Sequence, residues 1–240
     1  MRRIPTRCLP AVAAAALLWA PPPAICQMMP GGQGGMGGMG RPSAGVPPSE
    51  EMQSSPTADK PEAEAKKAYT AGMKSLAKAK DHESAAAGAQ NADKKSSALE
   101  KMGDAYNRAL DQFTEALRNK GDMYEAWNNV GYIHLRLGAY AESVDDYNHT
   151  LALKPDLTEA VLHRAEAYLA LDRLDDAKSA YMDLFNHERA LADQLMTAMQ
   201  KWLAEHRGNA NGMRVSDVDA FDKWLQEREG IAKQTASLAP

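Results

Sequence analysis

Residues 124–157, YEAWNNVGYIHLRLGAYAESVDDYNHTLALKPDL, decide the fold, because residues 158–191 repeat their pattern. The residues that recur in the next unit are Asp122, Glu125, Ala126, Leu135, Leu137 and Tyr147, which return as Asp156, Glu159, Ala160, Leu169, Leu171 and Tyr181. A period near 34 is typical of stacked helical hairpins, because one hairpin cannot bury its apolar face alone. We therefore expect an all-α fold.

Each half of this stretch has the pattern of one helix. Asp122 followed by Glu125 is an acidic variant of a capping box and predicts the start of the first helix, and Asp156 with Glu159 predicts the start of the helix after Pro155. Gly138 supplies the positive φ that a tight turn requires, and Pro155 ends the second helix. The first helix carries an apolar face, and we expect Trp127 to be its large core residue. The apolar stripe of the second helix consists of Tyr140, Val144, Tyr147 and Leu151.

These residues resemble the tetratricopeptide repeat. The positions that carry the resemblance in this unit are Trp127, Val130, Gly131, His134, Ser143, Tyr147, Thr150 and Pro155. In the next unit they are Val161, Ala165, Tyr168, Ala177 and Tyr181, with Arg164 at a position that is usually Leu. The resemblance implies antiparallel helical hairpins stacked in a right-handed superhelix, with further helices capping the C-terminal end.

The units on either side are less regular. Residues 62–80 and 99–120 predict the two helices of an irregular first repeat, separated by an insert near 81–95. Either the turn is extended, or the second helix starts early. We therefore expect a repeat domain over residues 62–187 and capping helices over 188–236. The aromatic residues Trp202, Phe221 and Trp224 lie on these capping helices.

The N-terminal part has the composition of an exported protein. Residues 1–26 combine a basic start with a short apolar run and predict a signal peptide of bacterial form. Cleavage after Cys26 would remove both cysteines, whereas lipidation of Cys26 is the alternative. Residues 27–61 are rich in Met, Gly and Pro and predict a disordered tether. Copper binding by its methionines is the alternative to a plain tether.

Charge and composition argue against several functions. The net charge is −4, and would be −7 without Arg2, Arg3 and Arg7, so nucleic acid is not the expected partner. No phosphate loop, metal-ligand spacing or nucleophile elbow occurs, and we expect no enzyme activity and no cofactor. His134 and His163 could approach each other on adjacent units, but a core role replacing Tyr is the expectation for His134. We expect Asp145 and Asp146 on a solvated face.

The resemblance also implies a binding surface. In tetratricopeptide repeats the first helix of each unit lines a concave groove that holds a protein or peptide. The corresponding residues are Glu125, Asn128, Asn129, Tyr132, Leu135, Arg136, Glu159, Leu162, His163, Glu166 and Leu169. Some members clamp a terminal carboxylate; Asn129 matches that clamp, but Glu159 and His163 replace its basic residues. An acidic groove with apolar residues suits a peptide of mixed basic and apolar character.

These observations predict a non-enzymatic scaffold or assembly factor of the bacterial cell envelope, periplasmic or secreted. The mature chain should hold no membrane span. A structural homodimer formed through Trp202, Phe221 and Trp224 is the alternative.

Overall fold

The computed structural model describes residues 59–207 and 213–236, and all regular secondary structure in these ranges is α-helical. The helices are α1 (Asp59–Ala87), α2 (Ala92–Asn119), α3 (Tyr124–Leu137), α4 (Tyr140–Leu153), α5 (Thr158–Ala170), α6 (Leu174–His187), α7 (Arg189–His206) and α8 (Val215–Ala236). They belong to one compact unit, which runs from Met52 to Pro240. The expected signal peptide and residues 27–58 of the expected tether lie outside the described residues.

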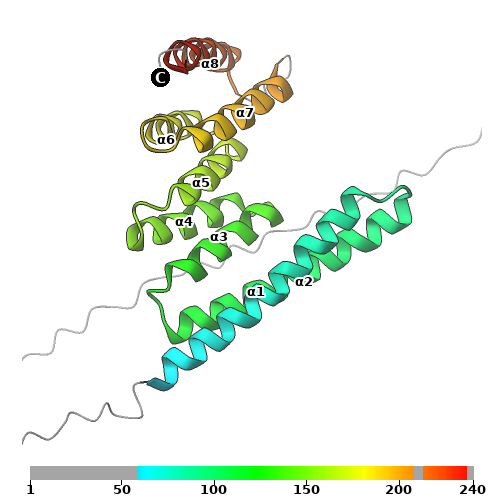
Figure 1. Ribbon diagram of the computed structural model, residues 1–240. Helices are drawn as coiled ribbons and strands as arrows, with labels where there is room; N and C mark the ends of the chain where they lie inside the picture. The colour runs from blue at the N-terminus through cyan, green and yellow to red at the C-terminus, as the bar shows by residue number, and fades with distance from the viewer. Residues whose placement is uncertain (1–58, 208–212, 237–240) are drawn as a thin grey trace, which may run out of the picture. The chain divides into compact units, whose positions relative to one another are not determined.

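Successive helices pair as antiparallel hairpins, which confirms the predicted fold class (Figure 1). Within each hairpin α1 packs on α2, α3 on α4 and α5 on α6. The hairpins join in order, because α2 contacts α3, α4 contacts α5 and α6 contacts α7. The first helices of neighbouring units also meet, α3 against α5 and α5 against α7. The result is a helical-repeat superhelix, in which α3, α5 and α7 form the inner row.

A glycine facing a large ring sets the spacing inside the first two hairpins. Gly131 on α3 lies under Tyr147 of α4, where a Cβ would come within 3.2 Å of the ring. Gly72 on α1 lies under Phe113 in the same way, at 2.7 Å. Phe113, Tyr147 and Tyr181 recur at intervals of one period and are all fully buried. The predicted periodicity therefore reaches into α2 of the first hairpin, although Gly72 does not stand one period before Gly131.

The expected insert lengthens the helices of the first hairpin and leaves only a short turn. α1 has 29 residues and α2 has 28, whereas α3 and α4 have 14 each. The structure thus has the early second helix rather than an extended turn. α1 also begins at Asp59, before the expected boundary at 62, because the first turn of a helix tolerates Pro61. At 1.5 Å per residue, this hairpin is roughly 20 Å longer than its neighbour.

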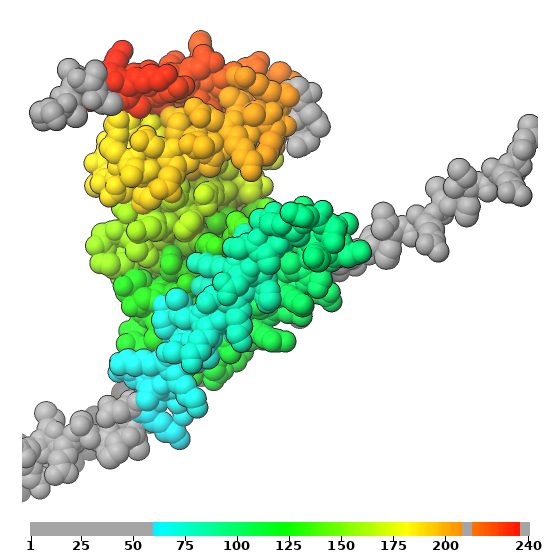
Figure 2. Space-filling model, turned by 45° about the vertical axis from the view of Figure 1, so that its right-hand side comes forward, coloured from blue at the N-terminus to red at the C-terminus, as the bar shows by residue number. Residues whose placement is uncertain are grey.

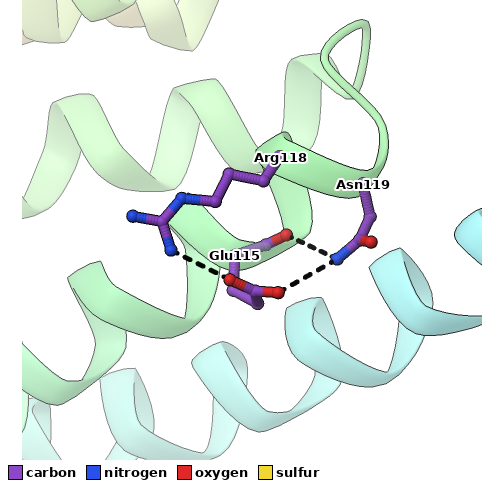
Figure 3. Close-up of polar contacts among 3 residues, drawn as sticks. All are labelled: Glu115, Arg118 and Asn119. Atoms are coloured by element: carbon purple, nitrogen blue, oxygen red, sulfur yellow. Dashed lines mark hydrogen bonds and ion pairs between the residues drawn. The ribbon is translucent and has the colours of Figure 1, made fainter.

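Side-chain hydrogen bonds close both ends of α2. The side chain of Asn91 accepts a hydrogen bond of 2.8 Å from the Lys94 backbone N–H at the N-terminus. At the C-terminus the Glu115 carboxylate accepts from Arg118 at 2.9 Å, and Asn119 Nδ2 donates to the Glu115 carbonyl at 2.9 Å (Figure 3). The bond to Asn91 satisfies one of the backbone N–H groups that a helix start leaves unpaired.

The predicted acidic capping of α3 and α5 is wrong. Their N-cap residues are Met123 and Leu157, and neither helix has a side-chain hydrogen bond at its cap. Both helices begin one residue later than the pattern predicts, so Asp122 and Asp156 lie one position too early to cap. Instead, a backbone N–H in the first turn donates to the carbonyl of the N-cap residue. In α3 the Ala126 N–H donates to the Met123 carbonyl at 3.1 Å.

Trp127 is not the core residue that the repeat pattern predicts. Its side chain is only half-buried and stacks on His149 of α4 with ring centroids 4.5 Å apart. Its indole N–H donates a hydrogen bond of 2.9 Å to the Gly121 carbonyl in the preceding turn. The buried ring of this hairpin is Tyr147, which Gly131 admits. Trp127 therefore joins the α2–α3 turn to α4 at the surface.

The two C-terminal helices close the stack. Trp202 and Phe221 are buried in the core cluster that α5 to α8 share, and their rings meet edge to face at 5.4 Å. The indole N–H of Trp202 donates to the Asp172 carboxylate at 3.2 Å in the α5–α6 turn. Asp172 has a φ of 57° there, at the position where the preceding unit has Gly138 with a φ of 81°.

Candidate peptide-binding surface

Polar and aromatic contacts join α1 to α3, the first helix of the inner row. Asn129 Nδ2 donates to the Tyr69 hydroxyl at 3.3 Å near the start of α3. The Lys80 ammonium lies 4.8 Å from the centre of the Tyr132 ring one turn further on. Arg136 forms an ion pair with Glu83 at the end of α3. Three predicted groove residues, Asn129, Tyr132 and Arg136, are thus held in place by α1.

A second group of rings continues this row from α3 to α5. The Tyr132 and His163 rings meet edge to face with centroids 5.9 Å apart, and His163 also stacks on Tyr147 at 6.1 Å. His163 Nδ1 lies 3.1 Å from the Glu166 carboxylate. Burial raises the pKa of the Tyr147 phenol, and the nearby Glu166 carboxylate raises it further. Tyr147 therefore stays a neutral, protonated phenol beneath His163.

Leu162 and Leu169 do not line an open groove, contrary to the prediction. Each is only 4% exposed, and both belong to the core cluster that includes Leu195 and Met199 of α7. Because α7 packs on α5, the leucines of α5 are covered by the next inner helix. Leu135 of α3 packs against the same cluster in the corresponding position. The apolar residues of the predicted groove are therefore contacts between successive inner helices.

Asn128 occupies the position that Leu162 has in the next unit. Its side chain is half-buried, and its Oδ1 atom is buried without a hydrogen-bond partner among the described residues. The predicted groove residues with exposed or half-buried side chains are Glu125, Asn128, Asn129, Tyr132, Leu135, Arg136, Glu159, His163 and Glu166. The surface that they form is polar and aromatic except for Leu135, which packs against the core cluster.

Two carboxylates on this surface have no basic partner. Glu125 and Glu159 are exposed, stand at equivalent positions of consecutive units, and form no ion pair with another described residue. Each lies in the first turn of its helix, on α3 and α5. The charge of Arg136 is offset by its ion pair with Glu83, and the Glu166 carboxylate lies 3.1 Å from His163 Nδ1. The uncompensated charge of the surface is therefore negative and repeats from one unit to the next.

Sequence reasoning missed the residues of α1 that belong to this surface. Tyr69, Lys80 and Glu83 were not predicted, because the long first hairpin removes α1 from the register of the later units. One signal in the sequence could have identified Tyr69. Tyr69 stands three residues before Gly72, just as Asn128 stands three residues before Gly131, and this position faces the neighbouring unit. Lys80 and Glu83 lie beyond the length of an ordinary unit and have no counterpart there.

His134 and Asp146 form a buried, hydrogen-bonded pair that was not predicted from the sequence. Asp146 is not on a solvated face; it is 7% exposed, and its Oδ2 lies 2.6 Å from His134 Nδ1. Burial raises the pKa of Asp146, while the bond to His134 opposes that rise. His134 and His163 are engaged by different carboxylates. No group of metal-binding side chains occurs among the described residues.

The helices in the described ranges are also too short or too polar to cross a lipid bilayer.

Comparisons with known proteins return matches from plants and yeast. A 77-residue stretch, 32% of this chain, is 29% identical to the SGT1 homologue protein of rice and spans 21% of that protein. The tetratricopeptide domain of Arabidopsis OM64 has 17% identity and a TM-score of 0.41, covering 56% of this chain and 98% of that domain. The TPR2B domain of yeast Sti1, solved with pHsp70, has 12% identity and a TM-score of 0.30, covering 63% and 98%. No family profile matches the chain.

Proposed function

We propose that this protein is a non-enzymatic interaction module that binds an extended, basic segment of another protein along α3 and α5. The observation that carries the proposal is the pair of exposed, unpaired carboxylates Glu125 and Glu159 at equivalent positions of consecutive units. An extended peptide spans successive units of a repeat array, so basic side chains along it meet one carboxylate per unit.

The contacts around these carboxylates support the same partner. Tyr132 and His163 present aromatic edges between the two units, where an aliphatic or aromatic side chain of the peptide would pack. Tyr69, Lys80 and Glu83 hold the α3 side chains in place, so little side-chain entropy is lost on binding. From the sequence we further propose that the protein is exported and serves as a scaffold or assembly factor in the bacterial cell envelope.

Selection from a random peptide library on residues 52–240 tests the binding mode. We expect selected peptides to be enriched in Lys and Arg next to apolar residues, with affinities that weaken as salt rises. The double variant E125K/E159K should bind these peptides at least about tenfold more weakly, since each lost contact is a charge-assisted one. Enrichment of acidic peptides, or unchanged affinity of the variant, would contradict the proposal.

The matched control reverses two carboxylates on α4, away from the inner row. Glu142 and Asp145 are exposed and form no ion pair with another described residue. The variant E142K/D145K therefore has the same net charge as E125K/E159K. If both variants lose affinity equally, overall charge rather than the proposed surface governs binding. Circular dichroism melts of both variants confirm that the helices persist.

A further inference from the structure

A line of lysines runs along the outward side of α1. Lys60, Lys67, Lys74 and Lys78 follow one another at intervals of seven, seven and four residues, which places them on one face of a helix. The buried residues of α1, among them Ala65 and Leu76, lie on the opposite face, toward α2. α1 is the first helix of the stack and forms part of the surface seen in Figure 2, where its first half is cyan.

These four lysines are not neutralised by neighbours. All four are exposed, and none forms an ion pair with another described residue. The two other lysines of α1 are engaged, Lys66 with Glu62 and Lys80 with the Tyr132 ring. Residues 65–80 contain no carboxylate. The line is therefore a basic strip on a chain whose net charge is −4.

The geometry points to an anionic lipid bilayer as the partner of this strip. The lysines are about 10 Å apart over each seven-residue interval, along one straight helix, and so match a flat, evenly charged surface. They are all Lys, which acts as a point charge, with no Arg among them for paired bonds to one phosphate. Small residues, Ala63, Thr70 and Ala71, lie between them on the same side of the helix, so a flat surface can approach closely.

Nucleic acid is a poorer match for the same strip. Tyr69 is the one aromatic residue of α1, and it faces Phe113 of α2 and Asn129 of α3 instead of the lysines. The strip therefore offers no ring on which a nucleotide base could stack.

We propose that α1 lies on anionic membranes through this lysine strip, and that the peptide-binding surface of α3 and α5 remains free for its partner. The attraction is electrostatic and reversible, and each lysine near an anionic bilayer strengthens binding about fivefold. Glu62 and Glu64 lie within the first interval, whereas residues 65–80 contain no carboxylate, so Lys67, Lys74 and Lys78 carry most of the attraction. Binding should therefore be weak, salt-sensitive and confined to bilayers that carry negative charge.

Vesicle co-sedimentation of residues 52–240 tests the proposal, because this range forms one compact unit and omits the apolar N-terminal segment. The probes are phosphatidylcholine vesicles with and without about one third phosphatidylglycerol. We expect sedimentation only with the anionic vesicles and its loss at high salt. The triple variant K67Q/K74Q/K78Q should lower the vesicle partition constant on the order of 100-fold.

The control variant removes three exposed lysines from the start of α2. K94Q/K95Q/K101Q has the same net charge as the first variant and leaves the α1 strip intact. We expect it to keep vesicle binding within about threefold. Equal loss in both variants would show that net charge alone governs binding and would overturn the proposal. Equal binding to neutral and anionic vesicles would also overturn it.

Two further outcomes assign the strip to another partner and thereby contradict the proposal. If polyglutamate binds the strip while anionic vesicles do not, the occupant is an acidic protein. If light scattering shows a dimer that K67Q/K74Q/K78Q dissociates, the occupant is a second copy of the chain. Vesicle binding that persists in E125K/E159K separates this surface from the peptide-binding surface, so either proposal can fail without the other.

Discussion

The second and third hairpins share one backbone plan but fill it with different chemistry. The only buried polar side chains among the described residues are Ser143, Asp146 and Thr150, all on α4. The equivalent residues of α6, one period later, are Ala177, Ala180 and Leu184. The α4 groups are each hydrogen-bonded nearby; Ser143 Oγ, for example, donates to the Gly131 carbonyl at 2.9 Å. The burial of a position is therefore kept from one unit to the next more strictly than its polarity.

The first prediction tests whether the burial of a side chain or its place in the repeat pattern determines its contribution to stability. Tyr147→Ala should lower the free energy of unfolding by about 3–5 kcal/mol, because it empties a fully buried site above Gly131. Trp127→Ala should cost only about 1–2 kcal/mol, since its indole is already partly exposed to solvent. Urea unfolding followed by circular dichroism measures both. A Trp127 variant as unstable as the Tyr147 variant would show that the repeat pattern, not burial, ranks these residues.

The second prediction concerns variants in which buried polar residues of the second hairpin are replaced by the corresponding residues of the third hairpin. Asp146→Ala alone should cost about 2 kcal/mol, because His134 loses its hydrogen-bond partner. The double variant H134Y/D146A installs the residues of the third hairpin, Tyr168 and Ala180, at both positions. It should be less than about 1 kcal/mol from the parent, since replacing a buried polar pair by apolar groups is often neutral. A double-mutant cycle with purely additive costs would mean that the pair does not interact.

The smallest predicted effect is a pH dependence of the free energy of unfolding that arises from Asp146. The third hairpin has Ala180 at this position, which cannot titrate. The pKa of Asp146 in the folded chain is raised above its ordinary value of 3.8 by burial. Folded Asp146 therefore binds a proton more tightly than unfolded Asp146. Its contribution to stability is present below the ordinary pKa and is lost as pH rises through the raised one. Relative to D146N, which does not titrate there, the parent should lose stability over that range.

Urea unfolding of both chains at several pH values between about 3.5 and 7 measures this difference. Groups that do not contact Asp146 affect the two chains alike and cancel. A gap that widens in favour of the parent as pH rises would mean that the bond to His134 outweighs the burial of Asp146.

Much of the fold follows from the sequence because the repeat period is a property of side-chain size. Tyr147, Tyr181 and Gly131 are visible as a pattern and occupy the expected places. The helix ends were less predictable, since Met123 and Leu157 cap through backbone bonds that any residue can make. On the candidate site, Glu125, Tyr132 and Glu159 lie at the surface, whereas Leu162 and Leu169 are buried. Their burial depends on α7, a helix outside the exact repeat that covers them.

The long first hairpin has a consequence for how such a chain can change length. The buried residues of α1 include Ala65, Gly72, Ala79 and Ala86, at heptad intervals, and Ala98 and Ala105 of α2 are spaced in the same way. Deleting seven residues from each of α1 and α2 would keep the buried face of each helix toward the other. It would also leave the register of the later units unchanged. Deleting one or two residues would turn the buried face outward. Relatives of this chain should therefore differ in the lengths of α1 and α2 by multiples of seven residues.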